Sequence, residues 1–224
     1  MSGILSIVAT PIGNLEDITL RALRVLKEAD YVLCEDTRVT GKLLAHYEIK
    51  AKLKRYDAHA SERVHESILN DLKEGKNIAL VSDAGTPAIS DPGVFLVARA
   101  PAAGARIDAI PGPSALTAVF SIAGIAGNSF AFLGFVPQKK GRETFFKGLA
   151  SYDLPVMFYE SPHRIMKTLE SLMLHLQDTI VVTIGRELTK MHEEVVRGSS
   201  EEVLAYFIDH PSHVRGEFVI IVSK

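Results

Sequence analysis

Four short loops in the N-terminal half are rich in glycine, proline, serine and acidic residues, whose polar groups could bind a ligand. They are residues 10–14, 35–38, 82–93 and 111–115. Each follows a short run rich in Val, Ile and Leu, and ligands of open α/β sheets bind at the carboxyl ends of the strands. Any one of these loops could be only a turn. Four of them at one sheet edge predict a ligand-binding site.

The third loop is the most unusual segment of the chain. It reads Ser-Asp-Ala-Gly-Thr-Pro-Ala-Ile-Ser-Asp-Pro-Gly, and Asp83 stands close to the end of the preceding apolar run. An aspartate in this place could do no more than cap a turn. Because a carboxylate beside free backbone groups also suits a polar ligand, we predict that Asp83 contributes to binding.

The elements that position these loops alternate between apolar runs and helical patterns. The runs are 4–9, 31–34, 78–82 and 107–110, with a further short strand near Leu53 and a helix at about 62–73. Asp17 is predicted to cap a helix whose apolar residues fall on one face. Such alternation is typical of a parallel sheet covered by helices. We therefore predict an α/β fold.

A second set of elements begins near residue 130. Predicted strands are 130–135, 156–159, 180–184 and 218–222. Ser161 and Pro162 form a favoured pair for the start of a helix, and Ser199 with Glu202 resembles a capping box for a helix to about residue 208. The uncharged segment 115–136 is long enough to cross a bilayer, but its internal glycines divide it into a helix and a strand. We predict two α/β domains, 1–112 and 113–224.

The composition argues against several classes of protein. The chain has 224 residues, 47% of them hydrophobic, and a formal net charge of −2, so any nucleic acid would be held by a local basic surface. Cys34 is the single cysteine, which excludes an intramolecular disulfide. The first residues lack the pattern of a signal peptide, and we expect a cytoplasmic location. No two glycines are two positions apart, so the GxGxxG fingerprint is absent, and so is a Walker A motif.

Seven strings, in order over nearly the full chain, resemble one family. They are ATPIGNLEDIT, CEDTR, SDAGTPAISDPG, IPGPSA, YESPHR, GRELTK and RGEFV. These strings are similar to the ribosomal RNA small subunit methyltransferase I family, in the tetrapyrrole-methylase-like class of S-adenosylmethionine (AdoMet) methyltransferases. The resemblance implies two α/β domains with AdoMet in the cleft between them, and a homodimer. It also implies 2′-O-methylation of a cytidine ribose in the decoding region of 16S rRNA, within the 30S subunit.

The resemblance implies a set of AdoMet-binding residues. Methyl transfer from a sulfonium is an in-line displacement that needs no metal, so such an enzyme can consist of a donor pocket and a device that presents the nucleophile. The implied donor-binding residues are Pro11, Ser82, Asp83, Ala84, Thr86, Ile89, Ser114, Ala115, Phe158, Tyr159 and Gly185.

A ribose hydroxyl is a weak nucleophile at neutral pH, so we expect a base or an organising hydrogen bond. The candidates are Glu35, Asp36, Glu160 and Glu187, of which the last two could equally form structural ion pairs with Arg164 or Arg186. Cationic side chains could bind the phosphates of the RNA. These candidates are Arg38, Lys139, Lys140, Arg142, His163, Arg164, Arg186 and Lys190.

The chain departs from the family pattern in two places. It has His59-Ala60-Ser61 where members usually have His-Asn-Glu, and it stops at Lys224 where they commonly continue into a small C-terminal helical segment. Two alternatives stay open. One is a methyltransferase of the same fold for a tetrapyrrole or a protein, against which the ATPIGN loop argues. The other is a non-catalytic ribosome-binding module.

Overall fold

The computed structural model describes residues 2–177 and 179–224, which form two compact units, Met1–Ser114 and Ala115–Lys224. Met1, the first residue of the segment that lacks a signal-peptide pattern, lies outside the described residues. Each unit has its own sheet and its own apolar core. Within the described ranges, no helix has the length and apolar character that a bilayer crossing requires.

The N-terminal unit is built on a five-stranded parallel sheet in the order β3-β2-β4-β1-β5. Its strands are β1 Ile4–Val8, β2 Tyr31–Cys34, β3 Leu53–Arg55, β4 Asn77–Leu80 and β5 Arg106–Ile110. Buried on both faces, the strands β1, β2 and β4 read as apolar runs rather than as alternating patterns, as parallel strands do. The predicted parallel sheet is confirmed.

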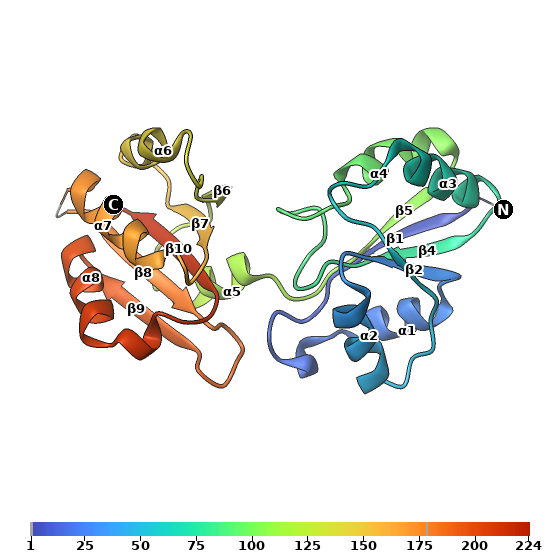
Figure 1. Ribbon diagram of the computed structural model, residues 1–224, viewed down its shortest axis with the longest axis horizontal. Coiled ribbons are helices and arrows are strands. Elements are labelled where there is room, and N and C mark those ends of the chain that lie inside the picture. Colours follow the sequence, from blue (N-terminus) through green and yellow to red (C-terminus); the bar gives the residue numbers. More distant parts are fainter. Residues whose placement is uncertain (1, 178) are drawn as a thin grey trace. The chain divides into compact units, whose positions relative to one another are not determined.

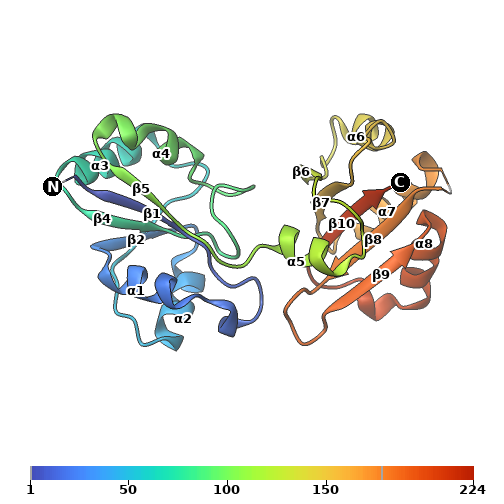
Figure 2. The ribbon, with the colours of Figure 1, turned by 180° about the vertical axis from the view of Figure 1, so that it is seen from behind.

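Helices cover both faces of this sheet (Figures 1 and 2). On one face, α1 Leu20–Glu28 and α2 Thr37–His46 pack against Val8, Val32 and Ala79. On the other, α3 Glu62–Lys73 and α4 Val94–Arg99 pack against Leu5 and Leu33. Alternate residues of each strand therefore serve two separate cores. The helix predicted at 62–73 is confirmed, whereas α2 and α4 were not predicted.

The predicted cap at Asp17 is wrong. Asn14 accepts a hydrogen bond from the backbone N–H of Glu16 at 3.0 Å and begins a short 3₁₀ helix, Leu15–Asp17. Thr19 then accepts from the N–H of Ala22 at 3.1 Å and caps α1. Asp, Asn and Thr are all favoured N-cap residues. Residue type alone therefore could not identify where the helix starts.

The C-terminal unit contains a mixed sheet in the order β6-β7-β10-β8-β9. Its strands are β6 Ala131–Phe135, β7 Val156–Glu160, β8 Val181–Arg186, β9 Glu194–Gly198 and β10 Phe218–Ser223. Only β6 and β7 pair in parallel, and β9 was not predicted. The core lies between one sheet face and the helices α6 Arg142–Leu149, α7 Ile165–His175 and α8 Ser200–Asp209. The helix α5 Ala115–Ile122 contacts β10.

Two predicted helix starts have opposite outcomes. The capping box of Ser199 and Glu202 is confirmed, with both reciprocal hydrogen bonds formed. Ser161 and Pro162, by contrast, lie in a turn, and α7 begins at Ile165 after Arg164. In that turn the N–H of Arg164 bonds to the carbonyl of Ser161 at 3.0 Å. The turn lets the Arg164 guanidinium reach the carboxylate of Glu160.

Candidate active site

The loops after β1 and β4 are tied together at the carboxyl edge of the parallel sheet. Thr10 and Gly85 exchange two backbone hydrogen bonds, of 2.9 and 3.0 Å. The Thr10 hydroxyl also donates to the carbonyl of Ser82 at 3.2 Å. β1 and β4 are neighbours, but the chain leaves β1 toward the face that holds α1 and leaves β4 toward the face that holds α4. Such a reversal is where open α/β sheets bind ligands.

The other two loops join the same edge. The N–H of Asp36, in the loop after β2, donates to the Asp83 carboxylate at 3.2 Å. The hydroxyl of Thr86 donates to the carbonyl of Pro113, in the loop after β5, at 3.3 Å. All four segments that the sequence analysis singled out are thus brought together within the N-terminal unit.

Three carboxylates gather at this edge: Glu35, Asp83 and Asp91. Burial raises the pKa of Glu35, and the negative charges of Asp91 and Asp83 raise it further. Burial also raises the pKa of Asp91 to about 6, with a smaller contribution from Asp83. Sequence reasoning did not single out Asp91, although the second acidic residue of the 82–93 loop was a usable signal. The edge carries a local negative charge on a chain that is nearly neutral overall.

Glycines allow the loops at the same edge to pack closely against neighbouring residues. A Cβ on Gly112 would lie 3.0 Å from the Cβ of Ala9, and Gly85 has a φ of +79°. Gly93 has a φ of +133°, and a Cβ there would lie 2.7 Å from the Leu80 side chain. At these positions the absence of a side chain lets the loops pack closely beside the carboxylates. A cationic sulfonium and an ammonium group fit such a negatively charged edge, so the residues present suit AdoMet.

The donor-binding residues predicted in this unit differ in accessibility. Asp83, Ala84 and Ile89 are exposed, and Thr86 is half-buried. Pro11 and Ser82 are buried, and the Ser82 hydroxyl donates to the carbonyls of its own loop. Ser114, also half-buried, ends the N-terminal unit. Ser82 and Pro11 therefore shape the loops, whereas Asp83 and Ile89 present side chains to solvent.

Two residues predicted to flank the adenine are buried inside the C-terminal unit. Phe158 is 0% exposed and belongs to the core beneath α6, α7 and α8. Gly185 is buried, and a Cβ there would lie 2.6 Å from Val119 of α5, so its lack of a side chain serves helix packing. Tyr159 is half-buried and points to the opposite face from Phe158, while Ala115 is the first residue of α5. The side chain of Phe158 is therefore part of the core of this unit.

Glu160 is held in a closed network. Its side chain is fully buried, and it accepts hydrogen bonds from the Thr168 hydroxyl at 2.6 Å and the Ser161 N–H at 2.7 Å. The guanidinium of Arg164 lies 2.7 Å and that of Arg142 3.6 Å from its carboxylate oxygens. The carboxylate is held by these two hydrogen bonds and between two guanidinium groups, so we interpret Glu160 as a structural residue. Arg142 and Arg164 are correspondingly engaged and do not form part of a free basic surface.

Two other predicted bases are also paired. Asp36 caps α2 and forms an ion pair with Arg38, and hydrogen bonds from Arg38 hold the pKa of Asp36 far below its usual value. Burial would raise the pKa of Glu187, but hydrogen bonds from Lys190 and from the N–H of Glu217 lower it overall. A carboxylate with a lowered pKa is a weak base. Glu35 is the predicted candidate whose pKa moves toward neutrality.

The predicted phosphate-binding cations fall into two groups. Arg186 is buried, donates to the carbonyls of Arg215 and His192, and lies 3.5 Å from Glu194. Lys190 is held by Glu187 and Glu217, as are Arg142 and Arg164 by Glu160. The exposed group comprises Arg38, Lys139, Lys140 and His163.

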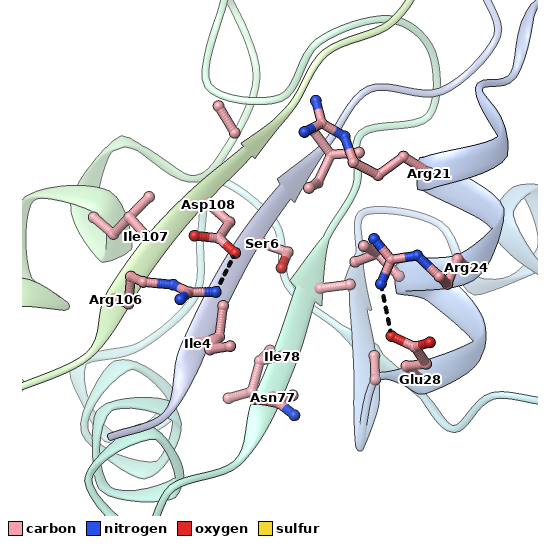
Figure 3. A pocket seen from close by; sticks show the side chains of 15 residues that line it. Ile4, Ser6, Arg21, Arg24, Glu28, Asn77, Ile78, Arg106, Ile107 and Asp108 are labelled. Carbon is pink, nitrogen blue, oxygen red and sulfur yellow. Dashed lines mark hydrogen bonds and ion pairs between the residues drawn. The ribbon is translucent and has the colours of Figure 1, made fainter. Parts of the chain in front are cut away.

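A hollow of about 560 Å³ lies elsewhere on the N-terminal unit, on the α1 face of β1, β4 and β5 (Figure 3). It reaches the amino ends of these strands, where Ile4 pairs with Asn77 and Arg106. Two of its arginines are neutralised, Arg106 by Asp108 at 2.7 Å and Arg24 by Glu28 at 3.0 Å. The hollow thus holds paired charges together with Arg21, and it lacks the cluster of carboxylates found at the carboxyl edge.

Comparison with known proteins identifies the class. The family of tetrapyrrole (corrin/porphyrin) methylases matches residues 5–204, and the chain belongs to this family. A cobalt precorrin-4 methyltransferase superposes with a TM-score of 0.71 at 19% identity, covering 98% of this chain and 94% of that one. A uroporphyrin-III C-methyltransferase from Thermus thermophilus gives 0.65 at 21% identity, with 99% and 94% covered. These two likenesses confirm the fold.

Three relatives of higher identity are each called Ribosomal RNA small subunit methyltransferase I. The protein of Halalkalibacterium halodurans is 47% identical over 222 residues, which cover 99% of this chain and 76% of the relative. That of Thermotoga maritima is 44% identical, with 99% and 98% covered. That of Escherichia coli O157:H7 is 44% identical, with 99% and 78% covered. The protein is thus a methyltransferase that uses AdoMet as its methyl donor.

Proposed function

We propose that this protein methylates the ribose 2′-hydroxyl of a cytidine in the decoding region of 16S rRNA, in the context of the 30S subunit. The observation that carries the proposal is the 44–47% identity, over 99% of the chain, to relatives named for methylation of the small-subunit RNA. The fold neighbours act on tetrapyrroles by name, but at 19–21% identity they support the fold alone.

The donor is proposed to bind at the carboxyl edge of the parallel sheet. When bound, AdoMet supplies a methyl group on a positively charged sulfur. Asp83 offers a carboxylate to its cationic groups, Thr86 and Ser114 offer polar groups, and Ile89 offers apolar surface. The C–S bond breaks as the new O–CH₃ bond forms, and the hydroxyl proton must be accepted by a base.

Glu35 is the base that we propose. It is half-buried, its pKa is raised by burial and by Asp91 and Asp83, and it lies in the loop beside the proposed donor residues. The other three candidates, Asp36, Glu160 and Glu187, are each held by a cationic side chain. Glu35→Gln should lower the methylation rate by roughly 100-fold or more with little change in AdoMet affinity. A rate within threefold of the original would exclude this role.

The substrate is tested by transfer of tritiated methyl groups from AdoMet to 30S subunits and to deproteinised 16S rRNA. Nuclease digestion should release labelled 2′-O-methylcytidine. Label on a base, or no transfer to either RNA, would contradict the proposal.

The donor site is tested with Asp83→Asn, which keeps an oxygen able to accept the Asp36 N–H but removes the charge. Calorimetry should show AdoMet binding at least tenfold weaker, while the exposed control Asp209→Asn leaves it unchanged. Unaltered affinity in Asp83→Asn would move the donor away from this loop.

The resemblance also leads us to propose a homodimer. Light scattering at micromolar concentration should give a mass near twice 24.5 kDa. A mass near 24.5 kDa would exclude the dimer under those conditions.

A further inference from the structure

An exposed aromatic ring stands at the end of an edge strand of the C-terminal unit. β6 forms one edge of the mixed sheet, and its register with β7 shifts between Phe132 and Phe135. Gly134 makes the shift possible with a φ of +68°. β-Bulges of this kind redirect side chains. Phe135 ends up 54% exposed, with its ring centroid 5.3 Å from that of Tyr159, which in turn lies 5.0 Å from Phe132.

The loop that follows Phe135 carries two lysines with no ion pair among residues 2–177 and 179–224. Lys139 and Lys140 are both exposed. Lys139 is four positions after Phe135, a span of at most about 14 Å. A ring and two ammonium groups are therefore within reach of neighbouring nucleotides of one strand.

Two arginines hold the backbone of the loop that follows Phe135. The Arg164 guanidinium donates to the carbonyl of Val136 at 3.0 Å, and that of Arg142 to the carbonyl of Pro137 at 3.5 Å. Both guanidinium groups are neutralised by the buried Glu160. The network therefore fixes the loop backbone and leaves the lysines as its free positive charges.

We propose that Phe135 and Tyr159 form a stacking platform for an unpaired base of the RNA substrate, whose flanking phosphates bind Lys139 and Lys140. The proposal rests on the proposed function and names the part of the site that recognises single-stranded RNA. Stacking of a base on an aromatic side chain contributes about 1–3 kcal/mol. Proteins recognise RNA largely through such unpaired, splayed bases.

The two lysines distinguish an RNA base from the adenine of AdoMet as the ligand of this platform. The family resemblance implies that Tyr159 lies beside the adenine of AdoMet, and this adenine could also stack on Phe135. AdoMet, however, carries no phosphate, and its sulfonium is positive. Two unpaired ammonium groups beside the platform disfavour a cation and favour a polyanion. Charge complementarity thus assigns the platform to the RNA.

The test measures RNA and AdoMet binding separately. A fluorescent single-stranded RNA with the decoding-region sequence is titrated by anisotropy, and AdoMet by calorimetry. Phe135→Ala should weaken RNA binding about 5- to 150-fold and leave AdoMet affinity unchanged. Phe135→Trp should keep RNA affinity within about threefold. Leu154→Ala, at another exposed apolar residue of this unit, is the matched control and should change neither.

The lysines are tested together as Lys139→Gln with Lys140→Gln. The slope of log affinity against log salt for single-stranded RNA should fall by about 1.4, because two phosphate contacts are lost. The pair Lys27→Gln with Lys73→Gln, both exposed in the N-terminal unit, should leave that slope unchanged.

Two results would overturn the platform: weakened AdoMet binding in Phe135→Ala, or RNA affinity that is unchanged in that variant. An unchanged salt slope in the double lysine variant would overturn the phosphate contacts. If the proposed function were wrong, the unmodified protein would transfer no methyl group to the RNA. That result is distinct from the binding results above.

Discussion

At the scale of single residues, the carboxylates separate into those that bind cations and those whose proton affinity is raised. Asp36, Glu160 and Glu187 each lie against an arginine or lysine of the fold. Glu35 and Asp91 are instead partly buried and lie near other acids, so burial first and the neighbouring negative charges second raise their pKa values. Raised pKa values of this kind concentrate at functional sites, because a structure gains no stability from crowding like charges.

Asp91 should make stability depend on pH. Its pKa is about 6 in the folded chain and about 3.9 in an unfolded one. The protonated form is favoured by folding, so this contribution to stability is complete below about pH 4 and is lost as the pH rises through about 6. Asp91→Asn should therefore stabilise the protein by roughly 1 kcal/mol at pH 8 and by much less at pH 4.

Urea unfolding of Asp91→Asn and the original protein at these two pH values gives the comparison. Asp209→Asn, at an exposed aspartate of the C-terminal unit, serves as the control. Equal stabilisation at pH 4 and pH 8 would show that the charge of Asp91 is not the cause.

Glu160 should behave as a structural residue. Glu160→Ala would leave two half-buried guanidinium groups without their carboxylate, and removal of one partner from a buried ion pair costs about 3–5 kcal/mol. The variant should lose thermal stability strongly while AdoMet affinity, measured below its unfolding temperature, stays within a fewfold. A stable variant that binds AdoMet but cannot transfer methyl groups would instead assign Glu160 to catalysis.

At the scale of elements, the bulge of β6 depends on one glycine. Gly134 adopts a left-handed conformation that costs an L-residue about 1–2 kcal/mol. Gly134→Ala should lower the free energy of unfolding by about that amount. If the strand relieves the strain by straightening, Phe135 turns toward the other face of the sheet, and RNA affinity falls as in Phe135→Ala.

Hydrogen exchange locates the effect of that substitution. Faster exchange should be confined to β6 and its neighbour β7, and Gly148→Ala, where a Cβ meets no atom within 4 Å, is the control. An unaltered stability would mean that the bulge does not require glycine.

At the scale of the whole molecule, the two units have separate cores. Leu72 lies fully buried in the core of the N-terminal unit, and Leu169 in that of the C-terminal unit. Leu72→Ala should cost about 2–5 kcal/mol, with faster amide exchange mainly within residues 2–114. Leu169→Ala should give the reverse pattern. Uniform loss of protection over both units from either variant would show that they unfold as one.

Local sequence determined the elements and the positions of the loops. Continuous apolar runs indicated the strands of the N-terminal sheet because parallel strands are buried on both faces, and Ser199 with Glu202 identified a helix start because both hydrogen bonds are local. The alternation of strands and helices also implied that the loops after β1, β2, β4 and β5 share one edge, since parallel strands end together. The family resemblance added the methyl donor, which no single loop could specify.

Tertiary structure alone decided the electrostatic state of each side chain. The sequence left open whether Glu160 acts in the site or forms an ion pair with Arg164. Arg142 lies 18 positions of chain from Glu160 and 22 from Arg164, and only the fold brings all three into one closed network. The pKa of Asp91 is raised by burial first and by the charge of Asp83 second, and the burial arises only when the chain has folded. Exposure of Phe135 follows from a bulge in the pairing of β6 with β7. Charge, burial and strand register depend on residues distant in sequence, so they become defined only when the chain has folded.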